Sequence, residues 1–81
     1  MRIDVRLGSG FSRLVGTPRL QVDVPAGATV DELLGAVAQE RPALAPGLPS
    51  ALTVVGGSQV GGERVLSEGD EVAVLAPVSG G

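Results

Sequence analysis

The chain has 81 residues, which limits it to one small domain with a single hydrophobic core. Apolar residues make up 43% and charged residues 19%, with 13 glycines and 6 prolines, so the sequence is too hydrophobic for disorder and too rich in loop formers for a helical bundle. It has no cysteine or histidine, a net charge of -3 and a single aromatic residue, Phe11, which excludes disulfides, zinc sites and thiol or imidazole catalysts and argues against a nucleic-acid partner. A basic protein surface is the more natural partner.

Two strands are predicted near the start of the chain. Residues 2–7 and 20–24 each alternate polar and apolar side chains, the pattern of a strand with one buried face. Because they follow one another closely, we expect them to pair antiparallel. The residues between them, including Phe11, are expected to form a loop longer than a tight hairpin turn.

One amphipathic helix is predicted in the middle of the chain. Thr29 and Glu32 have the spacing of a capping box, in which each side chain bonds the other residue's backbone N–H. The helix should run from about residue 30 to Arg41, because Pro42 disfavours helical geometry in the residue before it. Its apolar residues recur with helical spacing on one stripe: Val30, Leu33, Leu34, Val37 and Ala38.

The second half of the chain predicts further strands. Residues 42–49 contain three prolines and predict an extended loop, followed by a strand at 52–55 and a diglycine turn. A short strand is predicted at 64–66 and a final one at 71–77. On the final strand, Val72 and Val74 should face the helix, and the alternate residues should cover the opposite face.

This order of elements predicts an α+β fold of the β-grasp, or ubiquitin-like, type. One helix can cover one face of a four- to five-stranded mixed sheet, and residues 1–77 should make up the domain. The expected core residues are Ile3, Val5, Leu7, Leu20, Val22, Val24, Val30, Leu33, Leu34, Val37, Leu52, Val54, Leu66, Val72 and Val74.

Motifs for bound ligands are weak in this sequence. A phosphate-binding loop requires a lysine, which the chain lacks, and Arg13 stands where the dinucleotide fingerprint needs a glycine. The adjacent carboxylates at 31–32 and 70–71 are typical of a helix start and a turn. Arg2 and Arg6 share one strand face, where they either meet an acidic partner or are solvated. No metal or cofactor site is predicted.

The C-terminal residues Val78, Ser79, Gly80 and Gly81 carry the strongest functional signal. Taken alone, a terminal diglycine is compatible with a frayed tail. Here it directly follows the last predicted strand, and we expect residues 78–81 to form a flexible tail. Two residues without a Cβ allow a tail to thread a narrow active site, where the Gly81 carboxylate could be activated, for example as an acyl-adenylate.

The sequence resembles the ubiquitin-like sulfur-carrier family, and within it the small subunits of molybdopterin synthase. The resemblance covers nearly the whole chain and is most specific at Gly69-Asp70-Glu71-Val72-Ala73 and at Pro77-Val78-Ser79-Gly80-Gly81. It implies that an E1-like adenylyltransferase, using ATP, adenylates the Gly81 carboxylate. A sulfur donor protein then converts the carboxylate to a thiocarboxylate. Val78, Ser79 and Gly80 would thread the partner's active site.

The same resemblance implies a large-subunit partner in a heterotetramer, which uses the thiocarboxylate sulfur to make molybdopterin for the molybdenum cofactor. Ala73, Leu75 and Pro77, beside the tail, are the expected partner interface. An alternative for Leu75 is that its own chain covers it, through the loop that holds Phe11.

Three departures from the branch keep other functions open. Gly8-Ser9, Ser12-Arg13 and Ala76-Pro77 stand where molybdopterin-type carriers commonly have Phe-Ala, Arg-Glu and Pro-Pro. The alternatives are a sulfur carrier for thiamine, cysteine or tRNA thiolation, and a ubiquitin-like modifier or interaction module. With no membrane span and no signal peptide predicted, we expect a cytoplasmic carrier that is not itself an enzyme.

Overall fold

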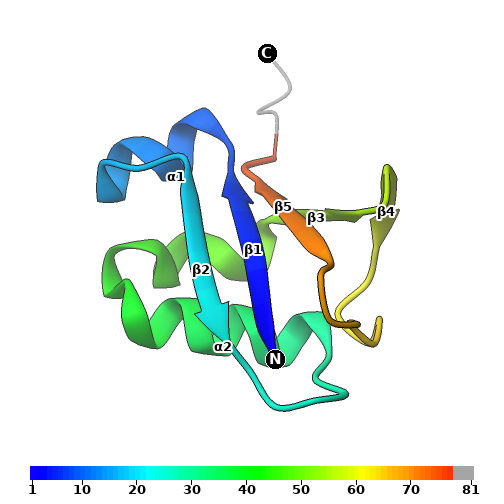
Figure 1. The fold of residues 1–81 in the computed structure, drawn as a ribbon. Helices are drawn as coiled ribbons and strands as arrows, with labels where there is room; N and C mark the ends of the chain where they lie inside the picture. The colour runs from blue at the N-terminus through cyan, green and yellow to red at the C-terminus, as the bar shows by residue number, and fades with distance from the viewer. Residues whose placement is uncertain (78–81) are drawn as a thin grey trace.

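Five strands form one mixed sheet in residues 1–77, the part of the chain that the computed structural model describes (Figure 1). In chain order the elements are β1 (Arg2–Leu7), α1 (Ser9–Val15), β2 (Arg19–Asp23), α2 (Val30–Glu40), the 3-10 helix η1 (Pro42–Ser50), β3 (Leu52–Val55), β4 (Ser58–Val60) and β5 (Glu71–Leu75). The predicted β-grasp architecture is confirmed.

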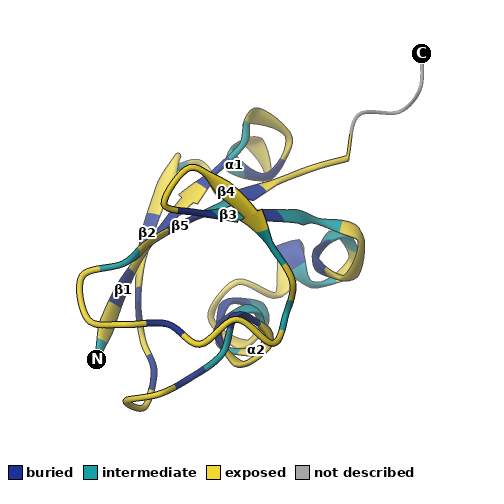
Figure 2. Ribbon diagram, turned by 90° about the vertical axis from the view of Figure 1, so that its right-hand side faces the viewer, coloured by how far each residue is buried: buried dark blue, intermediate teal, exposed yellow. Residues whose placement is uncertain are grey.

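The sheet has the strand order β2-β1-β5-β3-β4. The first two strands pair antiparallel, as predicted, with Ile3 opposite Val22 and Val5 opposite Leu20. The central pair, β1 and β5, is parallel, whereas β5–β3 and β3–β4 are antiparallel. Figure 2 shows α2 on one side of the sheet and the other side uncovered. We call this uncovered side the outer face.

The predicted capping box starts α2. The Glu32 backbone N–H donates to Thr29 Oγ1 at 3.2 Å, and the Thr29 backbone N–H donates to Glu32 Oε1 at 2.9 Å. The helix ends at Glu40, ahead of Pro42, and buries Val30, Leu33 and Val37. Leu34, predicted as a core residue, is only half-buried because it lies at the edge of the stripe, beside a surface hollow between α2 and η1.

The prediction of a simple loop between the first two strands was wrong, because residues 9–15 form α1. Its N-cap is Gly8, which has no side chain to cap the helix, so the usual start signal is missing. The helix ends at Gly16, whose φ of 76° is the left-handed conformation that favours glycine. Burial of Phe11 holds this short helix against the domain.

The prediction of an extended loop at 42–49 was also wrong, because this segment forms η1. Proline fixes φ near the value that a 3-10 turn needs, and Pro42 occupies the first turn, where its missing N–H removes no bond. Leu44 and Leu48 are buried in the core, and η1 packs against α2 and α1, which stabilises the segment. The sequence pattern of three prolines therefore marks consecutive tight turns here.

β3 presents the opposite residues from those predicted. Thr53 and Val55 face the core, whereas Leu52 and Val54 are half-buried on the outer face. The pairing with β5 sets this register, since Thr53 lies opposite the buried Val74. Thr53 can be buried because its hydroxyl donates to the Val60 carbonyl at 2.8 Å.

The short strand follows the diglycine turn directly and does not lie at 64–66, so that prediction was wrong. Gly56 and Gly57 have φ of 60° and 81°, the geometry of a two-residue hairpin turn that leads into β4. Val65 makes only an isolated bridge to Thr29.

The last strand, β5, ends at Leu75 rather than at the predicted residue 77, because Leu52, the partner of Leu75, is the first residue of β3.

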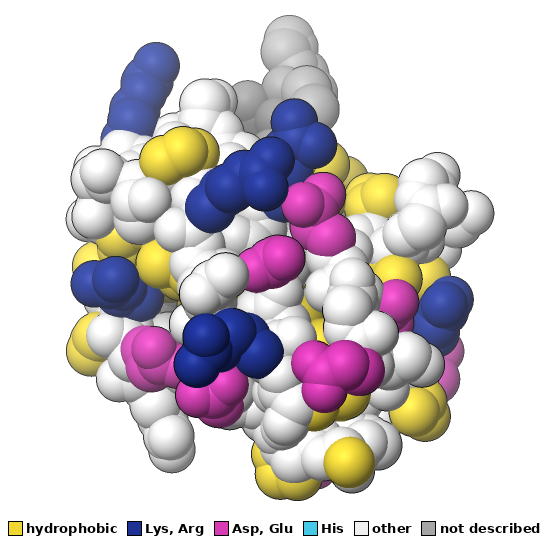
Figure 3. Space-filling view, viewed as in Figure 1, with side chains coloured by type: hydrophobic (Ala, Val, Ile, Leu, Met, Phe, Trp, Pro, Cys, Tyr) yellow, Lys and Arg dark blue, Asp and Glu magenta, His cyan; other side chains and the backbone are white. Residues whose placement is uncertain are grey.

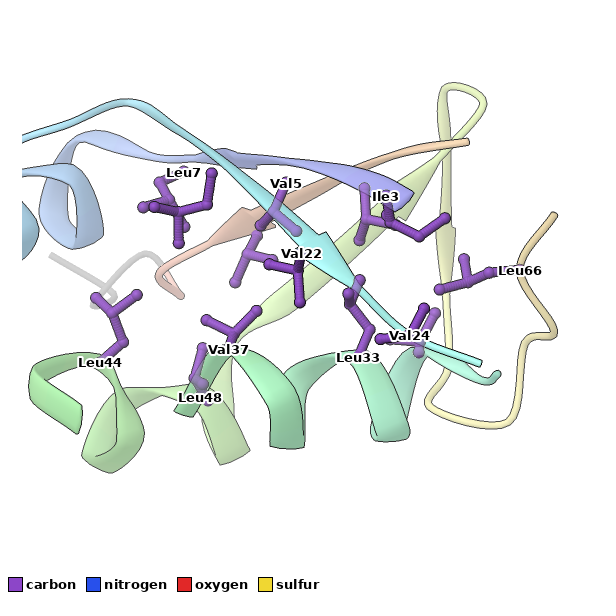
Figure 4. Close-up of a cluster of buried hydrophobic side chains, with 14 of the residues drawn as sticks. Ile3, Val5, Leu7, Val22, Val24, Leu33, Val37, Leu44, Leu48 and Leu66 are labelled. Carbon is purple, nitrogen blue, oxygen red and sulfur yellow. The ribbon is translucent and has the colours of Figure 1, made fainter. Parts of the chain in front are cut away.

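The core fills the space between the sheet and the helices (Figure 4). All predicted core residues are buried except Leu34, Leu52 and Val54. Six further residues are buried that the sequence analysis did not assign to the core: Phe11, Ala28, Leu44, Leu48, Thr53 and Val55.

Candidate functional site

The candidate site lies on the outer face, at the end of β5 that leads towards the tail. Val78, Ser79, Gly80 and Gly81 lie outside the described residues. Of the predicted interface, Ala73 is half-buried, Leu75 is 37% exposed and Pro77 is exposed. Ala73 and Leu75 point away from the core, as predicted, because Val72 and Val74 are fully buried.

Four apolar residues form a patch on two neighbouring strands of the outer face. Leu75 lies opposite Leu52, and Ala73 lies opposite Val54. Leu52 and Val54 were missed as surface residues because the register of β3 could not be read from a run of apolar residues. The strand pairing therefore adds two apolar residues to the predicted surface.

A hollow of about 370 Å³ lies beside this patch. Arg6, Leu7 and Gly8 line one side of it, and Val54, Ala73 and Leu75 line the other. A Cβ placed on Gly8 would lie 3.1 Å from Leu75 Cδ2, so the Leu75 side chain leans over the Gly8 backbone. Phe11 turns into the core, and Leu75 keeps 37% of its surface exposed beside Gly8, so the segment that holds Phe11 covers Leu75 only in part.

Charged side chains of both signs are scattered over the outer face (Figure 3). Arg2 Nε lies 3.3 Å from Asp23 Oδ1, and Arg19 Nη1 lies 3.5 Å from Glu71 Oε2. Both pairs are well exposed and contribute little to stability. Arg6, on the same face, has no ion pair within residues 1–77.

The adjacent carboxylates have structural roles, as the sequence predicts. Glu32 completes the capping box, and Asp70 Oδ2 accepts from the Ser67 backbone N–H at 2.8 Å in the turn before β5. Residues 1–77 contain no group of three or more Asp and Glu side chains placed to share a metal ion. In the same residues no helix is both long and apolar enough to cross a membrane.

The β-grasp fold described above is that of the ubiquitin-like sulfur carriers, a class of small carrier proteins. Residues 11–81 match the ThiS family, and the chain belongs to this family of ubiquitin-like sulfur carriers. A comparison with curated proteins finds no match.

Solved structures show the same fold. SAMP1, the small archaeal modifier protein 1 of Haloferax volcanii, is 26% identical over the whole of both chains, with a TM-score of 0.90. A chain of the BexX/CysO complex of Amycolatopsis orientalis is 21% identical over 98% of this chain and 99% of its own, with a TM-score of 0.79. A chain of the complex between subunits 1 and 2 of the Helicobacter pylori molybdopterin-converting factor is 22% identical over both full lengths, with a TM-score of 0.70.

Proposed function

We propose that this protein carries sulfur on its C-terminal glycine. The Gly81 carboxylate attacks the α-phosphorus of ATP within an E1-like enzyme, which releases pyrophosphate and leaves an acyl-adenylate. A persulfide on the sulfur donor protein attacks the acyl carbon and displaces AMP. A thiol then reduces the acyl disulfide so formed, which leaves a thiocarboxylate at the terminus and a disulfide on the donor side. The carrier itself supplies no catalytic group and binds no cofactor in this scheme, because the partner binds ATP.

The observation that carries the proposal is the connection of the tail to the sheet. β5 lies in the centre of the sheet, paired on both sides, so the residues after Leu75 begin from one of the most firmly held strands. The patch beside it offers a partner apolar contact area, and Val78, Ser79 and Gly80 would thread the active site. Membership of the ThiS family supports the same assignment.

We assign the carrier to molybdopterin synthesis, as the small subunit of molybdopterin synthase, acting in the cytoplasm. The Pro77-Val78-Ser79-Gly80-Gly81 ending resembles that branch. The Helicobacter pylori structure is a complex of subunits 1 and 2 of a molybdopterin-converting factor, which supports a large-subunit partner for this chain. A heterotetramer, implied by the resemblance, is the expected assembly.

A second candidate is a ubiquitin-like modifier, joined to lysines of other proteins through Gly81. The identity to SAMP1 over the whole of both chains favours it. The resemblance to a chain of the BexX/CysO complex likewise keeps a sulfur carrier for another pathway in view. All of these functions share the activated terminus and differ in the acceptor.

Intact-mass analysis tests the shared step. The chain is co-expressed with its activating enzyme and a sulfur source, and the expected product has one oxygen replaced by sulfur. A variant lacking Gly80 and Gly81 is the control, and a modification that persists in it would contradict the proposal. Adding the molybdopterin synthase large subunit and the pterin precursor separates the pathways, because only a molybdopterin carrier yields molybdopterin.

A further inference from the structure

We propose, on the basis of the carrier function above, that Arg6 is a specificity-determining contact for the E1-like activating enzyme. Its guanidinium would bind an Asp or Glu carboxylate of that enzyme. An apolar side chain next to that carboxylate would enter the hollow between Gly8, Val54 and Leu75.

The first support is the position of Arg6 on the sheet. Parallel pairing places Arg6 beside Ala73 and Leu7 beside Val74, at the end of β5 from which the chain continues towards the tail. Arg2, the other arginine of β1, lies four residues earlier at the opposite end of the strand. An enzyme that holds the tail would therefore lie near Arg6 and away from Arg2.

The second support is that the carboxylates near Arg6 are already bonded to other groups of the domain. Glu71 pairs with Arg19, whose side chain crosses β1 to reach it from β2. Asp4 accepts from Gln21 Nε2 at 3.2 Å. Asp70, which lines an adjoining hollow with Arg6, accepts from the turn backbone. Of the two arginines on β1, Arg2 is paired with Asp23 and Arg6 has no carboxylate within salt-bridge distance in residues 1–77.

The third support is electrostatic repulsion at Arg6 in the domain without its partner. Arg6 lies directly opposite Arg19 in the β1–β2 register, and like charges in that position weaken strand pairing. Its other lateral neighbour is Ala73, and apolar residues line the hollow that it faces. A carboxylate brought by a partner would relieve the repulsion and would form a charge-assisted hydrogen bond in a site that binding desolvates.

Calorimetric titration of the full chain into the activating enzyme tests the inference. Arg6→Gln keeps a polar side chain and removes the charge, and Arg2→Gln is a matched control on the same strand and face. We expect Arg6→Gln to weaken binding roughly 10- to 100-fold, the range for losing one partner of a desolvated charge pair. Arg2→Gln should stay within about twofold, as expected for an exposed pair. The thermal midpoint of Arg6→Gln should equal or exceed that of the unaltered chain.

Two results would overturn the inference: equal affinity of Arg6→Gln and the unaltered chain, or equal weakening by both variants, which would reflect net charge alone. Intact-mass analysis of the unaltered chain separates this from the carrier function. A thiocarboxylate formed without any dependence of affinity on Arg6 leaves the function standing and removes the contact. If binding depends on Arg6 but no thiocarboxylate forms, the contact stands and the carrier function is removed.

Discussion

Replacing Gly47 by alanine should destabilise the domain through one aromatic ring. A Cβ at Gly47 would lie 2.8 Å from Phe11 Cε1 and 3.4 Å from Cζ. Carbon atoms in contact normally lie about 3.5–4.0 Å apart, so the ring must move by more than about half an ångström. Phe11 is 4% exposed and belongs to α1, which packs against η1, so the ring has little room to move. Overpacking of this kind costs about 1–3 kcal/mol.

Thermal and urea unfolding measure this effect. In a domain of this size, about 1 kcal/mol lowers the melting temperature by roughly 4–8 °C, so a clear decrease is expected. Gly35→Ala is the matched control, because a Cβ there meets nothing within 4 Å on an exposed position of α2. It should raise the free energy of unfolding by about 0.5–1 kcal/mol, the helix preference for alanine.

A double-mutant cycle isolates the contact. Phe11→Leu removes the ring carbons that the new methyl group would strike, so Gly47→Ala should cost less in that background. Additive losses in the double variant, or a Gly47→Ala protein as stable as the unaltered one, would refute the reasoning. Either result would mean that Phe11 is not the limiting neighbour of Gly47.

Three further predictions concern the tail, the patch and the helix cap. Gly80→Val restricts the backbone of the threading residue, so intact mass should show loss of adenylation while the melting temperature stays the same. A lower melting temperature would mean that the tail packs on the domain. Leu75→Asp puts a charge into an apolar contact and should weaken calorimetric binding to the activating enzyme by several kcal/mol. Unchanged affinity would remove Leu75 from the interface. Thr29→Ala removes the acceptor for the Glu32 N–H and should lower the free energy of urea unfolding by about 1 kcal/mol, whereas no change would show that solvent replaces the cap.

The sequence predicts those elements whose own residues determine them. Alternation in residues 2–7 and the Thr29–Glu32 capping box predict β1 and the start of α2, and the structure confirms both. α1 and η1 were missed because contacts between distant residues stabilise them: Phe11 and Gly47 meet only after folding. Neither segment carries a local signal strong enough to show this.

The same distinction applies to the candidate site. The outward direction of Ala73 and Leu75 follows from the period of a strand, and the structure confirms it. That Leu52 and Val54 belong to the apolar patch could not be predicted without the β3 register. In this register Thr53 faces the core, where its hydroxyl is hydrogen-bonded. Similarly, the sequence shows two arginines on β1, but only the register with β2 places Arg2 opposite Asp23, with which it forms an ion pair, and Arg6 opposite Arg19.

The central position of β5 has a consequence for how the chain folds. β5 is the last strand of the described chain, and in the sheet it lies between two antiparallel strand pairs, β1–β2 and β3–β4. Without β5, the inner edge of each pair, β1 or β3, is exposed and can pair with other chains. Completing the sheet pairs β1 with β5, the first and last strands in the sequence, and contacts between residues so far apart slow folding. A chain truncated before Glu71 would therefore leave the inner edges of β1 and β3 unpaired and prone to aggregation, so a complete sheet requires the segment from which the tail extends.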